Sequence, residues 1–408
     1  MSGSAGTFPP DGASTSLDDL VAAYLQQLDD GRDVDPARFV EPWPQHQVEF
    51  LEFAARHSGL DRMTTRPVTD AAQMPWRETS EERNGLEAEF QMGGLLGRGG
   101  MGTVWAATRR SDQQRVAIKI LNASVATVDD NRIRFLREAR AIQSLDHHHI
   151  VPCLDVGHAS GSPYLVMKLI DGVTLSDVVA EQMRSGSNRS TVALADSNSK
   201  EPHSDANSRV SECLAQAQRS NTYFHTIAQL IADVAAAVKA AHEQAIVHRD
   251  IKPSNLMLDC IGTVWLTDFG LASIGDAQTL LSHTGDILGT PAFMSPEQAS
   301  GNRDVVDHRT DIYALGATLY TLAALQRPYT GSSHKVLRDV SEGILTPPSK
   351  HRADIPRDVE AIILKAMARD PAKRYQSCAS LETELRRFVE GHRVRARLPG
   401  PANRFVLR

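Results

Sequence analysis

A glycine-rich stretch that begins near residue 95 constrains the fold of this chain more than any other segment. Gly97, Gly99 and Gly102 lie between apolar and β-branched residues. This pattern predicts a strand, a tight turn and a returning strand. Because glycine has no side chain, the backbone N–H groups of such a turn can approach and cover phosphates. The sequence therefore predicts a phosphate-covering hairpin over residues 95–105.

A dinucleotide-binding turn of the Rossmann type is the alternative for this stretch. That turn requires a helix directly after the glycines and an acidic residue about twenty positions further on. Here the residues after Gly102 continue as a strand, and Val116-Ala117-Ile118-Lys119 predicts a third strand that ends in a lysine. These features favour the phosphate-covering hairpin.

A charged octapeptide, His248–Asn255, carries candidate chemistry. Asp250 could accept a proton from an attacking hydroxyl group, and Lys252 could hold a phosphoryl oxygen. Asn255, together with the later Asp268, could offer hard oxygen ligands to Mg²⁺. This set of groups fits phosphoryl transfer. A solvated charged turn is the commoner explanation for an isolated Asp-x-Lys, so the interpretation depends on the rest of the chain.

Composition limits the classes of partner. The 408 residues are 41% hydrophobic, which is enough for two or three domains with a sizeable core. A net charge of −6 offers no basic field for nucleic acid or an anionic membrane, and no segment approaches the roughly twenty apolar residues that span a bilayer.

We expect no metal at His147–His149, because adjacent side chains point in different directions. Isolated cysteines predict reduced thiols and a cytoplasmic location; they are Cys153, Cys213, Cys260 and Cys378.

The first 89 residues predict a separate small unit. Apolar residues recur at helical spacing over Leu17–Leu28, and a second helical pattern ends near Ser58. We therefore expect a helical N-terminal extension over residues 1–61, which either docks to another domain or partner or is a partly ordered leader. Residues 62–89 have few apolar positions and predict a linker. No basic and apolar signal peptide is present at the start.

Three further segments have clear patterns. Residues 131–145 are helical in pattern, with Glu138 near the middle, where arginines on both sides favour a surface acid when it is considered alone. Tyr164–Met167 predicts a short strand. Tyr223–Glu243 predicts an alanine-rich core helix that leads into the octapeptide.

The order of these motifs resembles that of the protein kinase family, and in detail that of its bacterial serine/threonine branch. The resemblance covers about residues 90–390. It rests on the glycine-rich turn, Val-Ala-Ile-Lys, the helix glutamate, His-Arg-Asp-x-Lys-x-x-Asn, Asp-Phe-Gly, Ser-Pro-Glu and Asp-Ile-Tyr-Ala-Leu-Gly. It implies an α+β, bilobal protein-kinase-like fold, with a β-rich N-lobe over 90–170, a helical C-lobe over 171–390, and the small helical extension in front.

The resemblance also implies catalytic roles. Lys119 would hold the α- and β-phosphates of ATP and pair with Glu138, while Asp250 would be the catalytic base with Lys252 beside it. Ser282 and Thr284 lie in a stretch that is similar to an activation segment, where a phosphate could be bound by Arg249. We therefore expect autophosphorylation in that segment.

The implied nucleotide site uses both lobes. Met167 resembles the gatekeeper, and the main chain of Lys168 and Ile170 would meet adenine. Many relatives carry an acid in place of Lys168, a difference of little consequence for a main-chain contact. Asn255 and Asp268 would bind Mg²⁺, with Mn²⁺ as an alternative ion. The implied set is Leu96, Gly97, Arg98, Gly99, Gly100, Gly102, Val104, Ala117, Lys119, Met167, Lys168, Ile170, Asn255, Met257 and Asp268.

Other features concern substrate type and chain organisation. Lys252 and Gly289-Thr290-Pro291 resemble the serine/threonine subgroup, and the family implies a buried ion pair between Glu297 and Arg374. Residues 181–221 are Ser/Asn-rich and predict a disordered insertion, either passive or a docking loop. Residues 391–408 form a short basic tail without a membrane anchor.

These features predict a serine/threonine protein kinase that transfers the γ-phosphoryl group of Mg-ATP to protein hydroxyls. The expected partners are protein substrates, not nucleic acid or a membrane span, and a kinase-domain homodimer is left open. A pseudokinase scaffold is the alternative, but its usual sign, loss of one of the catalytic residues, is absent. A small-molecule phosphotransferase of the same fold is disfavoured by the peptide-binding motifs of the resembling family.

Overall fold

The computed structural model describes most of the chain from residue 85 onward. The described ranges are 85–99, 102–121, 139–159, 162–187, 222–269, 291–301 and 305–398, with a few positions between 24 and 50. The chain divides into two compact units, residues 1–78 and 79–408. The division falls within the segment that we expected to be a linker.

The smaller unit has an aromatic core. The rings of Tyr24 and Phe50 meet edge to face at 5.2 Å between centroids, and Phe39 lies 5.3 Å from Tyr24. Tyr24 and Phe50 are buried and helical, one in each of the two predicted helical patterns. Such rings contribute large apolar area and prefer this edge-to-face arrangement. A contact of this kind is what a small helical hairpin needs for a core of its own.

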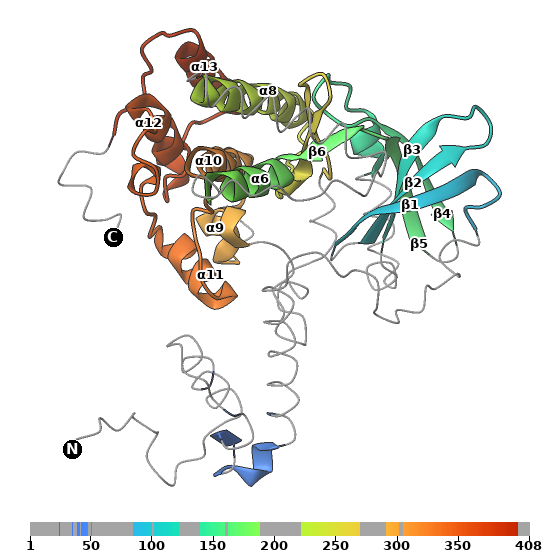
Figure 1. The fold of residues 1–408 in the computed structure, drawn as a ribbon, viewed down its shortest axis with the longest axis horizontal. Helices are drawn as coiled ribbons and strands as arrows, with labels where there is room; N and C mark the ends of the chain where they lie inside the picture. Colours follow the sequence, from blue (N-terminus) through green and yellow to red (C-terminus); the bar gives the residue numbers. More distant parts are fainter. Residues whose placement is uncertain are drawn as a thin grey trace, which may run out of the picture. The chain divides into compact units, whose positions relative to one another are not determined.

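The N-lobe is a five-stranded antiparallel sheet (Figure 1). Its strand order is β1-β2-β3-β5-β4. The predicted hairpin and third strand are present as β1, β2 and β3. The strands are β1 (Phe90–Gly99), β2 (Gly102–Arg109), β3 (Arg115–Leu121), β4 (Cys153–Ala159) and β5 (Ser162–Lys168).

Gly102 begins β2 at a point where no side chain fits. A Cβ atom added there would lie 2.0 Å from the carbonyl oxygen of Ile120 on β3. The close approach of two backbones explains one glycine of the motif. By contrast, a Cβ at Gly97 would meet nothing within 4 Å. The two glycines belong to one sequence pattern, but close packing of the backbone requires glycine only at Gly102 and not at Gly97.

Leu86 belongs to the N-lobe and not to a linker. Its side chain is 1% exposed and packs in one cluster with Phe90, Val116 and Ile118. Our expectation that the linker extends to residue 89 was therefore wrong at its end. A single leucine among polar residues forms no repeating apolar pattern, so the local sequence could not predict that it is buried.

The C-lobe is mainly helical, with a small second sheet of strand order β6-β7-β8. Its strands are β6 (Gly172–Thr174), β7 (Leu256–Asp259) and β8 (Val264–Leu266). Its helices are α6 (Leu175–Ser187), α8 (Tyr223–Glu243), α9 (Pro296–Ala299), α10 (Arg309–Ala324), α11 (Ser333–Glu342), α12 (Arg357–Ala366) and α13 (Cys378–Val389).

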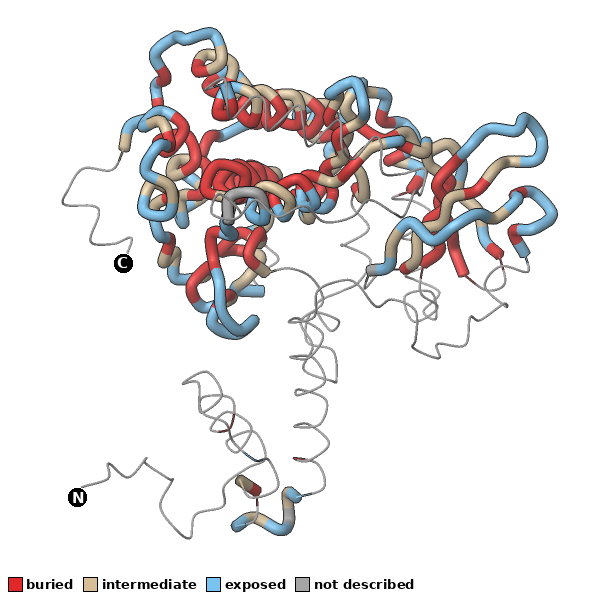
Figure 2. The backbone as a smooth tube through the Cα atoms, in the orientation of Figure 1, coloured by how far each residue is buried: buried red, intermediate tan, exposed pale blue. Residues whose placement is uncertain are grey.

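Helices α8 and α10 carry the core of this lobe, where buried residues gather (Figure 2). All residues of α10 from Thr310 to Ala324 are buried, as expected of a helix enclosed on every side. In the described part of the chain, α8 alone is long and apolar enough to cross a membrane. Most of it is buried, however, and its Asp233 pairs with Arg386 of α13 at 3.1 Å. Helix α8 is therefore a core helix, as predicted.

Two segments differ from the expected organisation. Helix α6 continues to Ser187, past residue 181, where we expected the insertion to begin. The described part of the basic tail packs on the C-lobe, with Val394 and Ala396 buried. Buried Glu384 accepts hydrogen bonds from the backbone N–H groups of Arg395 and Ala396 at 2.9 and 2.8 Å. This carboxylate fastens the segment as far as residue 398.

Candidate active site

The octapeptide His248–Asn255 connects α8 to β7, and a buried carboxylate holds its backbone. Asp311 on α10 is fully buried and accepts the backbone N–H of His248 at 2.9 Å and that of Arg249 at 2.7 Å. The ring of His242 on α8 lies 2.8 Å from the same carboxylate. Arg249 has a φ of 65°, a conformation that costs free energy in a non-glycine residue. The bonds from Asp311 stabilise that conformation.

The role of Asp311 was not anticipated, although it stands in the Asp-Ile-Tyr-Ala-Leu-Gly motif. One signal was available in the sequence. An acid in an otherwise apolar helix must be paired, because an uncompensated buried charge is strongly unfavourable. Its partners lie more than sixty positions away, so no spacing rule identifies them.

The three predicted side chains of the octapeptide meet. Lys252 Nζ donates to Asp250 Oδ2 at 2.8 Å. Asn255 Nδ2 donates to the backbone oxygen of Asp250 at 2.8 Å and to Oδ2 at 3.1 Å. Within the described residues, Asp250 Oδ1 has no hydrogen-bond partner. One carboxylate oxygen is thus fixed in place, and the other can accept a proton.

Lys119 and Asp268 join the two lobes. Lys119 Nζ on β3 lies 2.6 Å from Asp268 Oδ1, and the lysine side chain is only 7% exposed. Burial would raise the pKa of Asp268, but the charge and hydrogen bond of Lys119, with the nearby His248 and Lys252, together outweigh it and lower the pKa below its usual value. Asp268 is therefore ionised at neutral pH.

Glu138 lies outside the described residues, so its pairing with Lys119 stays a prediction. The described residues 139–143 that follow it are helical, as expected for this segment. Among the described residues, Lys119 pairs with Asp268.

Asn255 and Asp268 fit the predicted metal role. Asp268 uses Oδ1 for Lys119, and in the described part of the molecule its Oδ2 has no hydrogen-bond partner. Asn255 donates through its nitrogen. Among the described residues, its Oδ1 has one long contact, 3.5 Å from Ser254 Oγ. Each residue thus offers one hard oxygen of the kind that Mg²⁺ prefers.

The histidine run serves the fold. His149 Nδ1 lies 2.9 Å from the backbone oxygen of Val264, and His147 Nδ1 accepts the N–H of His149 at 3.2 Å. Among the residues described here, no group of three or more His, Cys, Asp or Glu side chains is placed to hold a metal ion. The histidines instead link this segment to β8.

The glycine-rich hairpin brings the predicted phosphate-covering residues together by strand pairing. In its register Gly97 is opposite Val104, Arg98 is opposite Thr103, and Gly99 is opposite Gly102. Leu96 is 46% exposed. Gly100 lies outside the described residues. The hairpin thus presents its backbone and two exposed leucines, Leu95 and Leu96.

The predicted adenine-binding residues come from β3, from the end of β5 with the residues after it, and from β7. Ala117 pairs with Met167, and the N–H of Lys168 donates to Pro152 at 3.1 Å. Ile170 is buried. The ammonium of Lys168 lies 4.2 Å from the ring centroid of Trp265, and Trp265 pairs across strands with Met257. The unusual lysine is therefore engaged by the C-lobe through a cation–π contact.

The predicted ion pair between Glu297 and Arg374 is confirmed. Arg374 Nη1 and Nη2 donate to the two carboxylate oxygens at 2.6 and 2.7 Å, and both side chains are buried. Arg374 also donates to the backbone oxygens of Arg309 and Ala368. Such a fully bonded buried pair resists the loss of either partner. It fixes α9 to the loop after α12.

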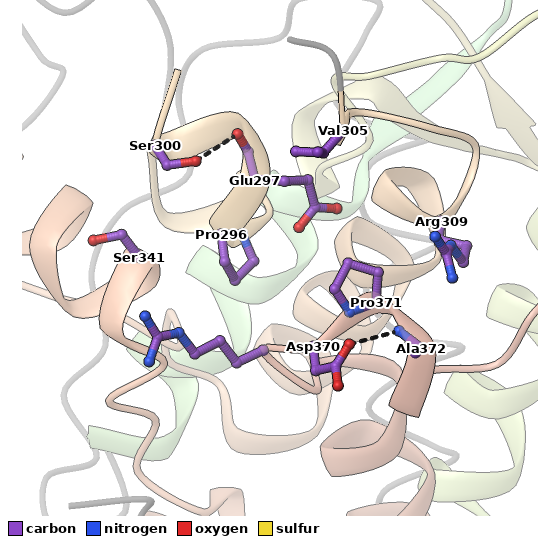
Figure 3. Close-up of a pocket in the computed structure, with 10 residues that line it drawn as sticks. Pro296, Glu297, Ser300, Val305, Arg309, Ser341, Asp370, Pro371 and Ala372 are labelled. Carbon is purple, nitrogen blue, oxygen red and sulfur yellow. Dashed lines mark hydrogen bonds between the residues drawn. The ribbon is translucent and has the colours of Figure 1, made fainter. Parts of the chain in front are cut away.

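A surface pocket lies beside this ion pair (Figure 3). Ser300 Oγ donates to the backbone oxygen of Glu297 at 3.0 Å, and Asp370 accepts the N–H of Ala372 at 2.9 Å. No predicted catalytic or nucleotide-binding residue lines this pocket. Its lining is Pro296, Glu297, Ser300, Val305, Arg309, Ser341, Arg369, Asp370, Pro371 and Ala372.

Most of the predicted activation segment lies outside the described residues. Ser282, Thr284, Gly289 and Thr290 lie outside the described residues. Arg249, the predicted phosphate-binding residue, is exposed, and its guanidinium makes no hydrogen bond or ion pair in the described part of the chain. Its regulatory role stays a prediction.

Comparisons with known proteins agree with this geometry. The family model "Protein kinase domain" matches residues 90–385. The serine/threonine-protein kinase PknB of Mycolicibacterium smegmatis is 32% identical over 313 residues, which are 75% of this chain and 44% of that protein. The serine/threonine-protein kinase PrkC of Bacillus subtilis is 31% identical over 310 residues, 76% of this chain and 42% of that protein. This chain thus spans less than half the length of these curated relatives.

A solved structure extends the similarity to three dimensions. The kinase domain of Mycobacterium tuberculosis PknI has a TM-score of 0.51 and 26% identity, over 74% of this chain and 96% of that one. The similarity covers nearly the whole of that domain, so both lobes contribute to it. The predicted α+β bilobal fold is confirmed. With its sheet, its catalytic octapeptide and its buried ion pair in this order, the chain belongs to the protein kinase domain family and is homologous to bacterial serine/threonine kinases.

Proposed function

We propose that this protein is an active serine/threonine protein kinase that transfers the γ-phosphoryl group of Mg-ATP to hydroxyl groups of proteins. One observation carries the proposal: Lys119 of the N-lobe lies 2.6 Å from Asp268, while Asp250 is held by Lys252 and Asn255. Five separate functional groups are thus positioned in the way that phosphoryl transfer requires. A pseudokinase scaffold needs none of this arrangement.

Asp250 acts as the base in this proposal. Its Oδ2 is oriented by Lys252 and Asn255, which leaves Oδ1 to accept the proton of an attacking serine or threonine hydroxyl. The ammonium of Lys252 supplies positive charge next to that reaction. Lys119 holds phosphates of ATP by its charge. Positioning and neutralisation of charge account for most of the catalysis in such reactions.

The oxygens of Asn255 and Asp268 would hold Mg²⁺. When bound, the ion neutralises charge on the phosphates of ATP. Asp268 is ionised for this purpose at neutral pH, since its pKa is lowered by Lys119 despite its burial. Lys119 and Asp268 would then share the charge of the nucleotide between the lobes.

Single substitutions test the assignment. Lys119→Met and Asp250→Asn should each reduce phosphorylation of a generic basic protein at least ~100-fold, because each removes a group that acts on the reacting atoms. Lys373→Met is the matched control, since Lys373 is exposed on the C-lobe. Labelled ATP and thermal unfolding are the measurements. Substantial transfer by either folded variant would contradict the proposal, and transfer only to small molecules would favour the alternative phosphotransferase.

Activation by autophosphorylation is the second part of the proposal. The guanidinium of Arg249 supports it, because it is exposed, has no partner among the described residues and lies next to the base, and arginine binds phosphate groups strongly. Mass spectrometry after incubation with ATP should find phosphate on Ser282 or Thr284. A fully active protein without phosphate between residues 273 and 290 would refute it.

We also propose a cytoplasmic location, which the free cysteines at 153, 260 and 378 support.

A further inference from the structure

Gln298 has a side chain with two separate tasks. It is the third residue of α9, whose N-cap is Ser295. Gln298 Oε1 accepts the backbone N–H of Ser295 at 3.0 Å, and Ser295 Oγ accepts the N–H of Gln298 at 3.4 Å. These two bonds form a capping box. In a capping box the side chain acts only as an acceptor, so glutamate serves as well as glutamine.

The amide nitrogen of Gln298 leaves the helix and reaches the catalytic octapeptide. Nε2 donates to the backbone oxygen of Arg249 at 3.0 Å, across 49 positions of sequence. A carboxylate has no proton to donate at neutral pH, so glutamate could not make this bond. The cap accounts for the oxygen of Gln298, and only the contact with Arg249 accounts for its nitrogen.

The bond acts on the peptide unit that precedes the catalytic base. The carbonyl of Arg249 and the N–H of Asp250 belong to one planar peptide group. The direction of that carbonyl therefore fixes the direction of the N–Cα bond of Asp250, from which its side chain extends. Arg249 has the unfavourable φ of 65°. Its N–H is held by Asp311 at 2.7 Å, and its carbonyl is held by Gln298 at 3.0 Å. Both ends of the strained residue are therefore fixed by side chains from other helices.

Helix α9 is itself firmly placed. Glu297, directly before Gln298, makes the buried pair with Arg374, and Ser295 Oγ lies 2.6 Å from Thr310 Oγ1 of α10. A donor on so rigid a support can hold a carbonyl in one direction. The arrangement links α9, which follows the predicted activation segment, to the base.

We propose that Gln298 is a positioning residue for the catalytic base, acting through its amide N–H on the Arg249–Asp250 peptide. This inference rests on the proposed kinase function and deepens it. Its printed contacts are with Ser295 and Arg249, so it would act through the peptide before the base and not on the reacting atoms. Its removal should lower the turnover rate and leave nucleotide binding unchanged.

Gln298→Glu separates the two tasks, because it keeps the capping acceptor and removes the donor. The purified full chain should phosphorylate a basic protein with a kcat reduced about tenfold or more, since small misplacements of reacting groups have large effects. The KM for ATP should stay within about twofold. Gln113→Glu is the matched control: Gln113 also donates to a backbone oxygen, that of Arg110 at 3.1 Å, in an exposed turn of the N-lobe.

Gln298→Met completes the test because it removes both the acceptor and the donor. A role in positioning predicts that the Glu and Met variants lose kcat alike. A role in capping alone predicts that the Glu variant matches Gln113→Glu, and that result would overturn the inference. Thermal unfolding checks that each variant is folded. If Gln298→Glu unfolds, Gln298→Met is compared with Ser295→Ala, which removes the hydroxyl half of the capping box but keeps the donor to Arg249. A lower kcat in Gln298→Met supports the inference, and equal kcat values overturn it.

The same assays separate this inference from the proposed function. Loss of transfer in Lys119→Met with wild-type kcat in Gln298→Glu would overturn only the role of Gln298. No transfer by the wild-type protein, or full transfer by Lys119→Met, would overturn both.

Discussion

The octapeptide His248–Asn255 and the glycine-rich hairpin both belong to the proposed ATP site, but they are held in different ways. The octapeptide is fixed by buried side chains, above all Asp311, which is fully buried on α10. The hairpin is held by strand pairing, and its Leu95 and Leu96 are 44% and 46% exposed. Side-chain anchoring fixes the position of single atoms, whereas strand pairing fixes a backbone surface. The base needs the first, and a cover over phosphates needs only the second.

The largest expected effect comes from removing the anchor of the octapeptide. Asp311→Ala leaves the N–H groups of His248 and Arg249 without their partner inside the C-lobe. We expect a loss of about 3 kcal/mol or more in the free energy of unfolding, and a fall in transfer of ~100-fold. Urea unfolding and labelled ATP are the measurements.

The control for this change is Asp112→Ala in the N-lobe, where the carboxylate pairs with Arg109 at the surface. A solvent-screened surface pair of this kind contributes little to stability, so Asp112→Ala should leave both measurements nearly unchanged. Equal effects of the two substitutions would show that Asp311 does not anchor the octapeptide.

In the hairpin, the two glycines Gly102 and Gly97 should respond differently to an added side chain, because only Gly102 lies against another backbone. Gly102→Ala places a Cβ 2.0 Å from the carbonyl oxygen of Ile120, so β2 must shift away from β3. We expect a loss of about 1–3 kcal/mol in unfolding free energy and weaker ATP binding. Gly97→Ala, where nothing lies within 4 Å, should change stability by less than about 0.5 kcal/mol. Similar melting temperatures for the two variants would contradict this account.

The contact between Lys119 and Asp268 joins the two lobes and gives a pH test. Because the pKa of Asp268 is lowered in the folded protein, its ionisation stabilises the fold above the pKa of the unfolded chain, about 3.9. That contribution is lost as the pH falls through the lower, folded pKa. The stability difference between the wild type and Asp268→Asn should thus be constant from pH 8 to pH 5 and shrink below about pH 4. A difference that changes between pH 5 and pH 8 would exclude this explanation.

The smallest effect is expected from the exposed hairpin leucine. Leu96→Ala should leave the unfolding free energy within about 0.5 kcal/mol, because the side chain is 46% exposed. It should weaken ATP binding about threefold to tenfold if the leucine covers adenine, since covering its exposed half contributes about 1 kcal/mol, roughly half of the value for full burial of a leucine. Ile261→Ala, in a C-lobe turn with 83% exposure, is the control. Equal ATP affinity for both variants would remove Leu96 from the nucleotide site.

Local patterns predicted much of this structure. Alternation and glycine spacing located the β1–β2 hairpin, and helical periodicity located α8 from Tyr223 to Glu243. The motif order implied the buried pair of Glu297 and Arg374. Leu86, the fastened segment near Val394 and the length of α6 were not anticipated. Their placement depends on neighbours distant in sequence and not on a repeating local pattern.

The sequence by itself determined the family, the order of the lobes and the identity of the chemical groups, because these follow from residue types at short spacings. Only the tertiary structure decided how Asp250, the proposed base, is held. The bonds from Asp311 and Gln298 to Arg249 join residues that are 62 and 49 positions apart. Contacts of that range depend on how helices pack around a shared core, and no local pattern in the chain records them.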